Sequence, residues 1–207
     1  MKLLNLGCGS NRPQDEHWWN LDLLQEILLS GTPERAQLDS EPRYVEHRLV
    51  CHRGFVPMPF LDDSFDGLIC SHVVEHFDCQ YAVKLLSDCH RILKPDGLLV
   101  VSVPDADYFL SVHDRDTPEN AVVLFGEPIH DKWQPNFMSY ALFHRDHRQV
   151  LTGGSLRCLL IQAGFKTIWR LGRFGHVPQS SELKEIEKIM NRRQFSLEMC
   201  AIKSSAP

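Results

Sequence analysis

Apolar and polar positions follow two alternating periods along this chain of 207 residues, which indicates strands and helices in turn. Between residues 79 and 93, Ala82, Leu86, Cys89 and Leu93 fall at helical spacing, with polar residues opposite. The pattern also predicts helices over 155–163 and 181–191, and a short helix and loop over 24–38. The expected strands cover 2–6, 19–23, 44–50, 65–70, 98–103, 165–171 and 195–202.

The order of these elements indicates an α/β fold. Strands alternate with helices, so we expect a mostly parallel sheet with helices on both faces. A chain of 207 residues suits one domain over 1–207 with a sizeable core. Residues 104–150 are rich in aromatic residues and His, and they lack the period of a regular element.

Composition excludes some classes of function. A net charge of -5 argues against a general binder of nucleic acid or anionic membrane, since both need a basic surface. The seven Cys contain no C-x-x-C pair, which favours reduced thiols in a cytosolic protein. No apolar run reaches membrane-spanning length, and the N-terminus does not resemble a signal peptide. We therefore expect a cytoplasmic protein.

The turn after the first strand is the first candidate site. In α/β sheets the carboxyl end of the first strand usually contacts the ligand, and here Gly7 and Gly9 let backbone approach it closely. A dinucleotide fingerprint has a third glycine where this chain has Arg12, so a pyrophosphate is less expected than a ligand without phosphates. Asp22, at the end of the second strand, suits both hydroxyls of a ribose. The structural alternatives are an ordinary tight turn for Gly7 and Gly9 and a helix N-cap for Asp22.

A second pattern, HVVEH at residues 72–76, fits the H-x-x-E-H motif of one class of zinc peptidases. On a helix, His72 and His76 would share one face, with Glu75 beside them as a general base. Only three positions of the motif are fixed, and the chain holds 11 His, so the pattern arises easily by chance. Its flanking sequence must decide its meaning.

That context comes from three motifs over 3–9, 58–77 and 91–105. In order and spacing they resemble the class I S-adenosylmethionine-dependent methyltransferases over roughly residues 1–105, with a fainter echo in 159–165 and the final strand. More narrowly, the glycine turn, WWNLDL and SHVVEH are similar to compact methyltransferases of bacterial polysaccharide and glycosyltransferase loci. The resemblance implies a Rossmann-like, seven-stranded, mostly parallel sheet with the last strand antiparallel. It also implies S-adenosylmethionine as cofactor and S-adenosylhomocysteine as product.

The resemblance also implies the binding residues. It places the glycine turn against the methionine and ribose of the cofactor, Asp22 on the ribose, the 54–55 pair at the adenine and the 71–72 pair beside the methionine. HVVEH then belongs to a cofactor loop, so no metal is expected. The implied cofactor-binding residues are Leu6, Gly7, Cys8, Gly9, Asn11, Asp22, Leu23, Gly54, Phe55, Ser71 and His72.

The chain departs from the family pattern in two places. The stretch from Gly9 to Asp22 is short and contains Pro13, Trp18 and Trp19, so the usual first helix is truncated or absent. The carboxylate that commonly binds the adenine amino group near Gly54 is missing, which puts cofactor affinity in doubt.

The expected reaction is methyl transfer to a hydroxyl or amine of a small molecule or saccharide. Such an acceptor gains from a general base, for which His76 is the first candidate, followed by His130, His144 and His147. Residues 104–150 would form an insertion or lid on the acceptor side. We expect no nucleic-acid or membrane partner, and homodimer formation is left open. The rival classes are a non-catalytic methyltransferase-like binding protein and a nicotinamide-dependent oxidoreductase, which the missing third glycine disfavours.

Overall fold

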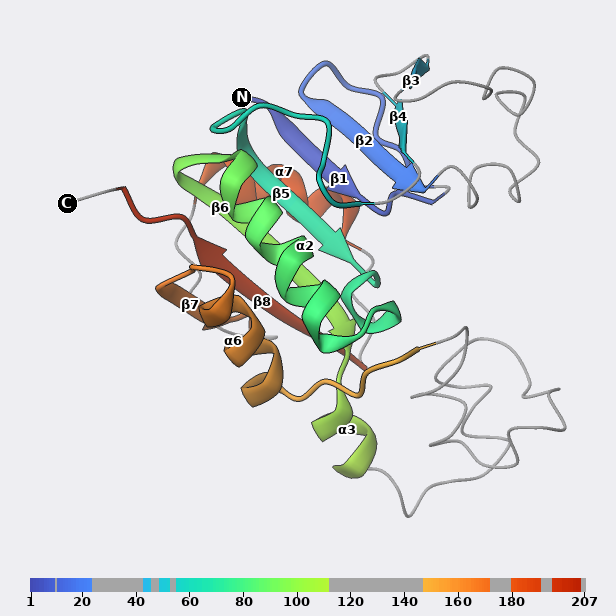
Figure 1. Ribbon diagram of the computed structural model, residues 1–207, viewed down its shortest axis with the longest axis vertical. Coiled ribbons are helices and arrows are strands. Elements are labelled where there is room, and N and C mark those ends of the chain that lie inside the picture. The colour runs from blue at the N-terminus through green and yellow to red at the C-terminus, as the bar shows by residue number, and fades with distance from the viewer. Residues whose placement is uncertain are drawn as a thin grey trace, which may run out of the picture.

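A computed structural model describes residues 1–9, 11–23, 43–45, 49–52, 55–111, 147–171, 180–190 and 195–205. Their strands form one eight-stranded sheet in the order β3-β4-β2-β1-β5-β6-β8-β7 (Figure 1). Neighbouring strands in the series β4, β2, β1, β5 and β6 are parallel, whereas β8 is antiparallel to both β6 and β7. The strands are β1 Leu3–Leu6, β2 Trp18–Leu23, β3 Arg43–Val45, β4 Leu49–His52, β5 Phe65–Ser71, β6 Leu93–Pro104, β7 Thr167–Arg170 and β8 Ser196–Ile202.

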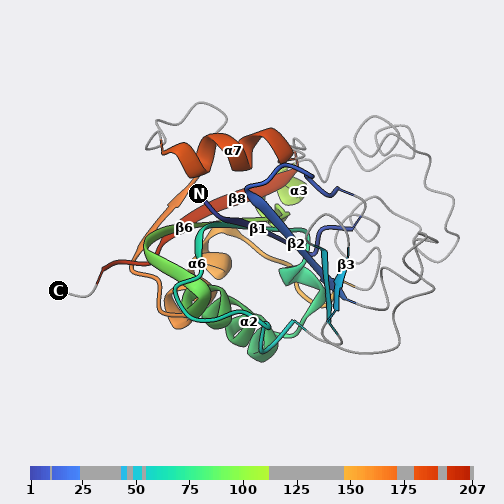
Figure 2. The same ribbon diagram turned by 90° about the horizontal axis from the view of Figure 1, so that it is seen from above.

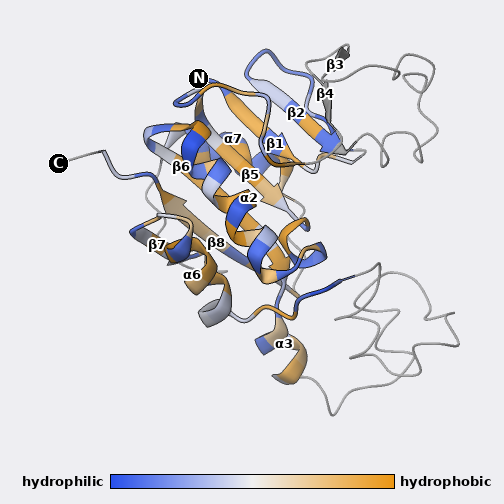
Figure 3. Ribbon diagram, in the orientation of Figure 1, coloured by the Kyte–Doolittle hydropathy of each residue, from blue (hydrophilic) through white to orange (hydrophobic). Residues whose placement is uncertain are grey.

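Helices cover both faces of the sheet (Figure 2). Helices α2 (Cys79–Ile92) and α6 (Gly153–Gln162) lie on one face and contact each other, while α7 (Ser181–Ile189) packs on the other. The strands between these layers are hydrophobic, as Figure 3 shows for β1 and β5, and every residue of β1 is buried. A mostly parallel sheet needs such cover on both faces, so the predicted α/β class and the antiparallel last strand are confirmed.

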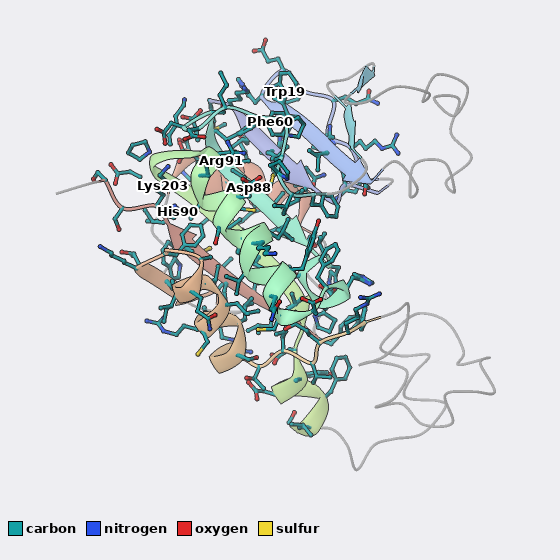
Figure 4. The ribbon with its side chains drawn as sticks, in the orientation of Figure 1. Trp19, Phe60, Asp88, His90, Arg91 and Lys203 are labelled. Atoms are coloured by element: carbon teal, nitrogen blue, oxygen red, sulfur yellow. The ribbon has the colours of Figure 1, made fainter. Side chains whose placement is uncertain are left out.

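Helix α2 follows the predicted periodicity. Asp78 caps its first turn by accepting a 2.8 Å hydrogen bond from the backbone N–H of Tyr81. Asp88, which falls on the predicted polar face, is buried instead, and it accepts hydrogen bonds of 2.6 Å from the backbone N–H of Met58 and from Nε of Arg91. Arg91 also donates to the carbonyl of Phe60 at 2.8 Å (Figure 4). The helix therefore holds the segment that leads from the candidate adenine residues into β5.

Two expectations about the elements are wrong. The predicted strand over 44–50 is divided into β3 and β4, which pair antiparallel, so the described sheet has eight strands and not seven. The apolar pattern cannot separate one strand from two that reverse direction within it. Residues 104–150 also contain a regular element, the short helix α3 (Ala106–Ser111), which begins directly after β6 and is too short to show a period.

The structure does not describe every helix that the sequence predicts. The predicted short helix over 24–38 lies outside the described residues. Among the helices that are described, none has the length and apolar character needed to cross a membrane.

Candidate functional site

The glycine turn lies at the carboxyl end of β1, between the ends of its two neighbours β2 and β5. Gly7 and Gly9 both take left-handed conformations, with φ of 69° and 50°. A Cβ on Gly7 would overlap Cγ2 of Val73, whereas a Cβ on Gly9 would meet no atom of the described residues within 4 Å. Gly7 therefore lets the turn pack against the loop after β5. Gly9 leaves open space in which a ligand can approach the backbone.

Asp22 points its carboxylate into this turn. The side chain is only 4% exposed, and Oδ2 accepts a 2.6 Å hydrogen bond from the backbone N–H of Gly9. The same oxygen lies 3.7 Å from Sγ of Cys8. Burial, followed by the negative charge of Asp22, raises the pKa of Cys8 to about 12, so this residue is a neutral thiol. The end of β2 thus places the carboxylate of Asp22 beside an uncharged thiol.

His72 begins the loop after β5 and is bound by protein groups at both ring nitrogens. Its backbone is left-handed, with φ of 54°, and its N–H donates to the carbonyl of Ser102 at 2.8 Å. Nδ1 lies 3.1 Å from Oε1 of Glu75, and Nε2 lies 3.2 Å from Oγ of Ser196. The backbone of Ser71 and His72 therefore lies at the carboxyl end of β5, where the sequence places it. The imidazole of His72, however, contacts Glu75 and Ser196 of β8.

Three further side chains meet just beyond this point. Glu75 and His76 belong to the 3-10 helix Val74–His76, and His147 reaches them from the segment before α6. The rings of His76 and His147 pack edge to face with centroids 4.8 Å apart. Nε2 of His147 lies 4.0 Å from Oε1 of Glu75. Two of the predicted catalytic histidines are thus neighbours, while His130 and His144 lie outside the described residues.

The remaining predicted residues are placed as follows. The side chain of Leu6 is fully buried in the core, so only its backbone can face a ligand at the carboxyl end of β1. Asn11 turns away from the glycine turn, because its Nδ2 donates to the carbonyl of Ile189 at 3.0 Å. Phe55 is buried and packs edge-on against Phe77, with ring centroids 5.9 Å apart. Leu23 ends β2, and Gly54 lies outside the described residues.

Sequence reasoning missed the central position of Glu75, which contacts both His72 and His147. The signal was present in HVVEH, because a motif that carries a carboxylate between two histidines predicts a polar cluster. Nothing in the sequence indicated His147 as its partner.

A family model described as a methyltransferase domain matches residues 4–101, just under half of the chain. A probable S-adenosylmethionine-dependent methyltransferase of Mycobacterium tuberculosis is 25% identical over 185 residues, which are 87% of this chain and 54% of that protein. A second, from Mycolicibacterium smegmatis, is 28% identical over 118 residues, covering 57% and 43%. The chain therefore spans about half the length of the curated relatives it matches.

Solved structures agree on the fold. An S-adenosylmethionine-dependent methyltransferase of Methanosarcina mazei superposes with a TM-score of 0.56 at 13% identity, covering 99% of this chain and 93% of that one. A Haloferax volcanii methyltransferase, solved in complex with the Trm112 methyltransferase activator, gives a TM-score of 0.53 at 17% identity, with coverages of 99% and 83%. The Rossmann-like methyltransferase fold is common to all three chains.

Proposed function

Because the family match, the relatives and the fold support a class I S-adenosylmethionine-dependent methyltransferase with S-adenosylmethionine as cofactor, we propose that this chain methylates a hydroxyl or amine of a small molecule or saccharide. The observation that carries the proposal is the buried Asp22 carboxylate bound to the backbone of an open glycine turn. Histidines lie one strand away, beyond the end of β5. The site thus combines a place for a ribose with groups able to serve an acceptor.

The residues present fit the cofactor. Gly9 faces open space, and the carboxylate of Asp22 can accept about four hydrogen bonds, so its bond to the turn is compatible with ribose hydroxyls. The backbone of Gly7 and Gly9 would hold the methionine part, and the segment at Phe55 would adjoin the adenine. When bound, S-adenosylmethionine supplies both the methyl group and its own leaving group. The protein then has to align the acceptor and exclude water.

The acceptor's proton needs a destination. A hydroxyl becomes a better nucleophile when a nearby imidazole nitrogen accepts its proton, and His76 remains our first candidate for that role. His147, whose ring packs against it, is the second candidate. Residues 104–150 leave the sheet at the carboxyl end of β6 and return at His147, so we place the acceptor insertion there within one domain over 1–207. The resemblance to methyltransferases of polysaccharide loci favours a saccharide acceptor.

Calorimetry with S-adenosylhomocysteine and NADH tests this proposal. We expect S-adenosylhomocysteine to bind with micromolar-range affinity and NADH to give no saturable heat. A screen of sugars and small phenols, read by release of homocysteine from the product, should then identify the acceptor. NADH binding without S-adenosylhomocysteine binding would restore the oxidoreductase class. Tight binding of S-adenosylhomocysteine with no transfer to any acceptor would favour the non-catalytic binding protein.

A further inference from the structure

Glu75 is a buried residue whose carboxyl group is satisfied only in part by the described residues. The side chain is 1% exposed, and Oε1 lies 3.1 Å from Nδ1 of His72. The second oxygen, Oε2, is also buried, and it has no hydrogen-bond partner among the residues that the structure describes. An ionised carboxylate is costly to bury unless it is paired, hydrogen-bonded or bound to a metal. A cation or a further donor at this oxygen would lower that cost.

Two imidazoles lie where a cation would need them. One ligand atom from each of Glu75, His76 and His147 lies within 4.8 Å of the others. Oε1 of Glu75 and Nε2 of His147 are 4.0 Å apart. Ligand atoms of a tetrahedral site with bonds of about 2.1 Å lie about 3.4 Å apart, so the three groups need to close by at most about 1.4 Å, a distance that small side-chain rotations can supply.

The backbone holds these groups together across a long stretch of sequence. The carbonyl of Glu75 accepts hydrogen bonds from the N–H groups of Arg148 at 2.8 Å and Gln149 at 3.1 Å. The side chain of Gln149 also donates to the carbonyl of Phe77 at 2.7 Å. His147 is therefore fixed beside the 3-10 helix by the residues that follow it, and the cluster does not depend on side-chain contacts alone.

We propose that Glu75, His76 and His147 bind a divalent transition-metal ion. Two imidazoles and one carboxylate suit Zn²⁺, Fe²⁺ or Mn²⁺ better than Mg²⁺ or Ca²⁺, which prefer oxygen ligands. Three protein ligands leave positions open for a substrate oxygen. His72 is not a ligand here; it binds Oε1 of Glu75 and orients the carboxylate.

The inference rests on the proposed function and changes the role of the histidines in it. A metal-bound hydroxyl loses its proton more easily, so His76 and His147 would act as ligands and not as free bases. The site adjoins the glycine turn, because the N–H of His76 donates to the carbonyl of Val73 at 3.2 Å and Val73 packs against Gly7. This proposal departs from the expectation of no metal, which was argued from the cofactor loop at HVVEH without His147 as a neighbour.

The test is metal binding by the full chain after removal of metals with a chelator. Zn²⁺ is titrated by calorimetry, and Co²⁺ is titrated by its visible absorption, which reports the ligand geometry. We expect one ion per chain, with affinity lowered at least about a hundredfold in Glu75→Gln and in His147→Ala, and about 10- to 100-fold in His72→Ala. The matched control is His17→Ala, which removes an imidazole beside the opposite, amino end of β1 and should bind the ion as the parent does.

The outcomes separate this inference from the proposed function. Absence of saturable Zn²⁺ and Co²⁺ binding overturns the metal site, and so does binding that Glu75→Gln and His147→Ala leave unchanged. S-adenosylhomocysteine binding is measured on the same chelated samples, because it should persist without the ion. If it persists while no metal binds, only the inference fails, and if it is absent, the proposed function fails. If thermal melting shows that Glu75→Gln does not fold, His147→Ala decides.

Discussion

Asp22 and Glu75 are two buried carboxylates at the same edge of the sheet, and their surroundings differ. Asp22 is the residue before the last in β2, is 4% exposed, and accepts a hydrogen bond from the backbone of the glycine turn. Glu75 follows β5, is 1% exposed, lies among imidazoles, and keeps one oxygen without a partner in the described structure. Backbone N–H groups make a fixed site for a neutral hydroxyl ligand, whereas imidazoles and an unpartnered oxygen favour a cation. We therefore propose that the surroundings of Asp22 bind the cofactor (the cofactor region) and that the surroundings of Glu75 serve the acceptor (the acceptor region).

The two regions meet where Val73 packs against Gly7. Gly7→Ala should break this contact, since the added methyl group overlaps a stiff, buried valine and the backbone is left-handed. We expect a loss of about 2 to 5 kcal/mol in the free energy of unfolding, the sum of backbone strain and overpacking. Gly9→Ala is the matched control, because its methyl group meets open space and should cost only about 1 to 2 kcal/mol. Urea denaturation measures both variants. Equal losses of unfolding free energy in Gly7→Ala and Gly9→Ala would show that Gly7 and Val73 are not in close contact.

His76→Ala tests the acceptor region. Turnover should fall by roughly a hundredfold or more, while S-adenosylhomocysteine affinity stays within about tenfold. The result holds whether the imidazole accepts a proton or binds a metal ion, because both roles act on the acceptor. Steady-state kinetics on the identified acceptor, with His17→Ala as control, measures it. Full turnover in the variant would show that His76 has only a structural role. The next candidates for the general base would then be His130, His144 and His147.

Asp22→Ala tests the cofactor region and should have the converse effect. We expect S-adenosylhomocysteine affinity to fall by about 1.5 to 3 kcal/mol, the scale of charge-assisted hydrogen bonds. Asp22→Asn keeps an oxygen for the N–H of Gly9 and should lose less. Calorimetry on the three proteins decides this point. An unchanged affinity in Asp22→Ala would mean that the ribose is bound elsewhere.

The close approach of the glycine turn to Asp22 could be predicted because its signals are local. Gly7, Gly9 and Asp22 lie close in the sequence, and the glycines mark a turn whose backbone conformation a larger side chain resists. Helix α2 likewise follows from its apolar spacing. A parallel sheet with helices on both faces follows from the alternation of such elements.

The acceptor region could not be predicted in the same way. Backbone hydrogen bonds join Glu75 to Arg148 and Gln149, the two residues after His147, and such bonds leave no trace in the side-chain pattern. The buried position of Asp88 was hidden for a similar reason, because the N–H of Met58 that it binds comes from a distant segment. The division of 44–50 into β3 and β4 also escaped prediction, since a short apolar run does not show where the chain reverses.

The anchoring of residues 105–111 beside 147–151 has a consequence for how this protein could diversify. The N–H of Ala106 donates to the carbonyl of Leu151 at 3.1 Å, and Glu75 binds the two residues after His147. The chain thus leaves and re-enters the core at adjacent, independently fixed points. Closing a loop between such points depends only weakly on its length, by roughly 0.6 kcal/mol for each doubling. Under the proposed function, replacement of the intervening segment would therefore be a way to alter acceptor choice without a change in the sheet.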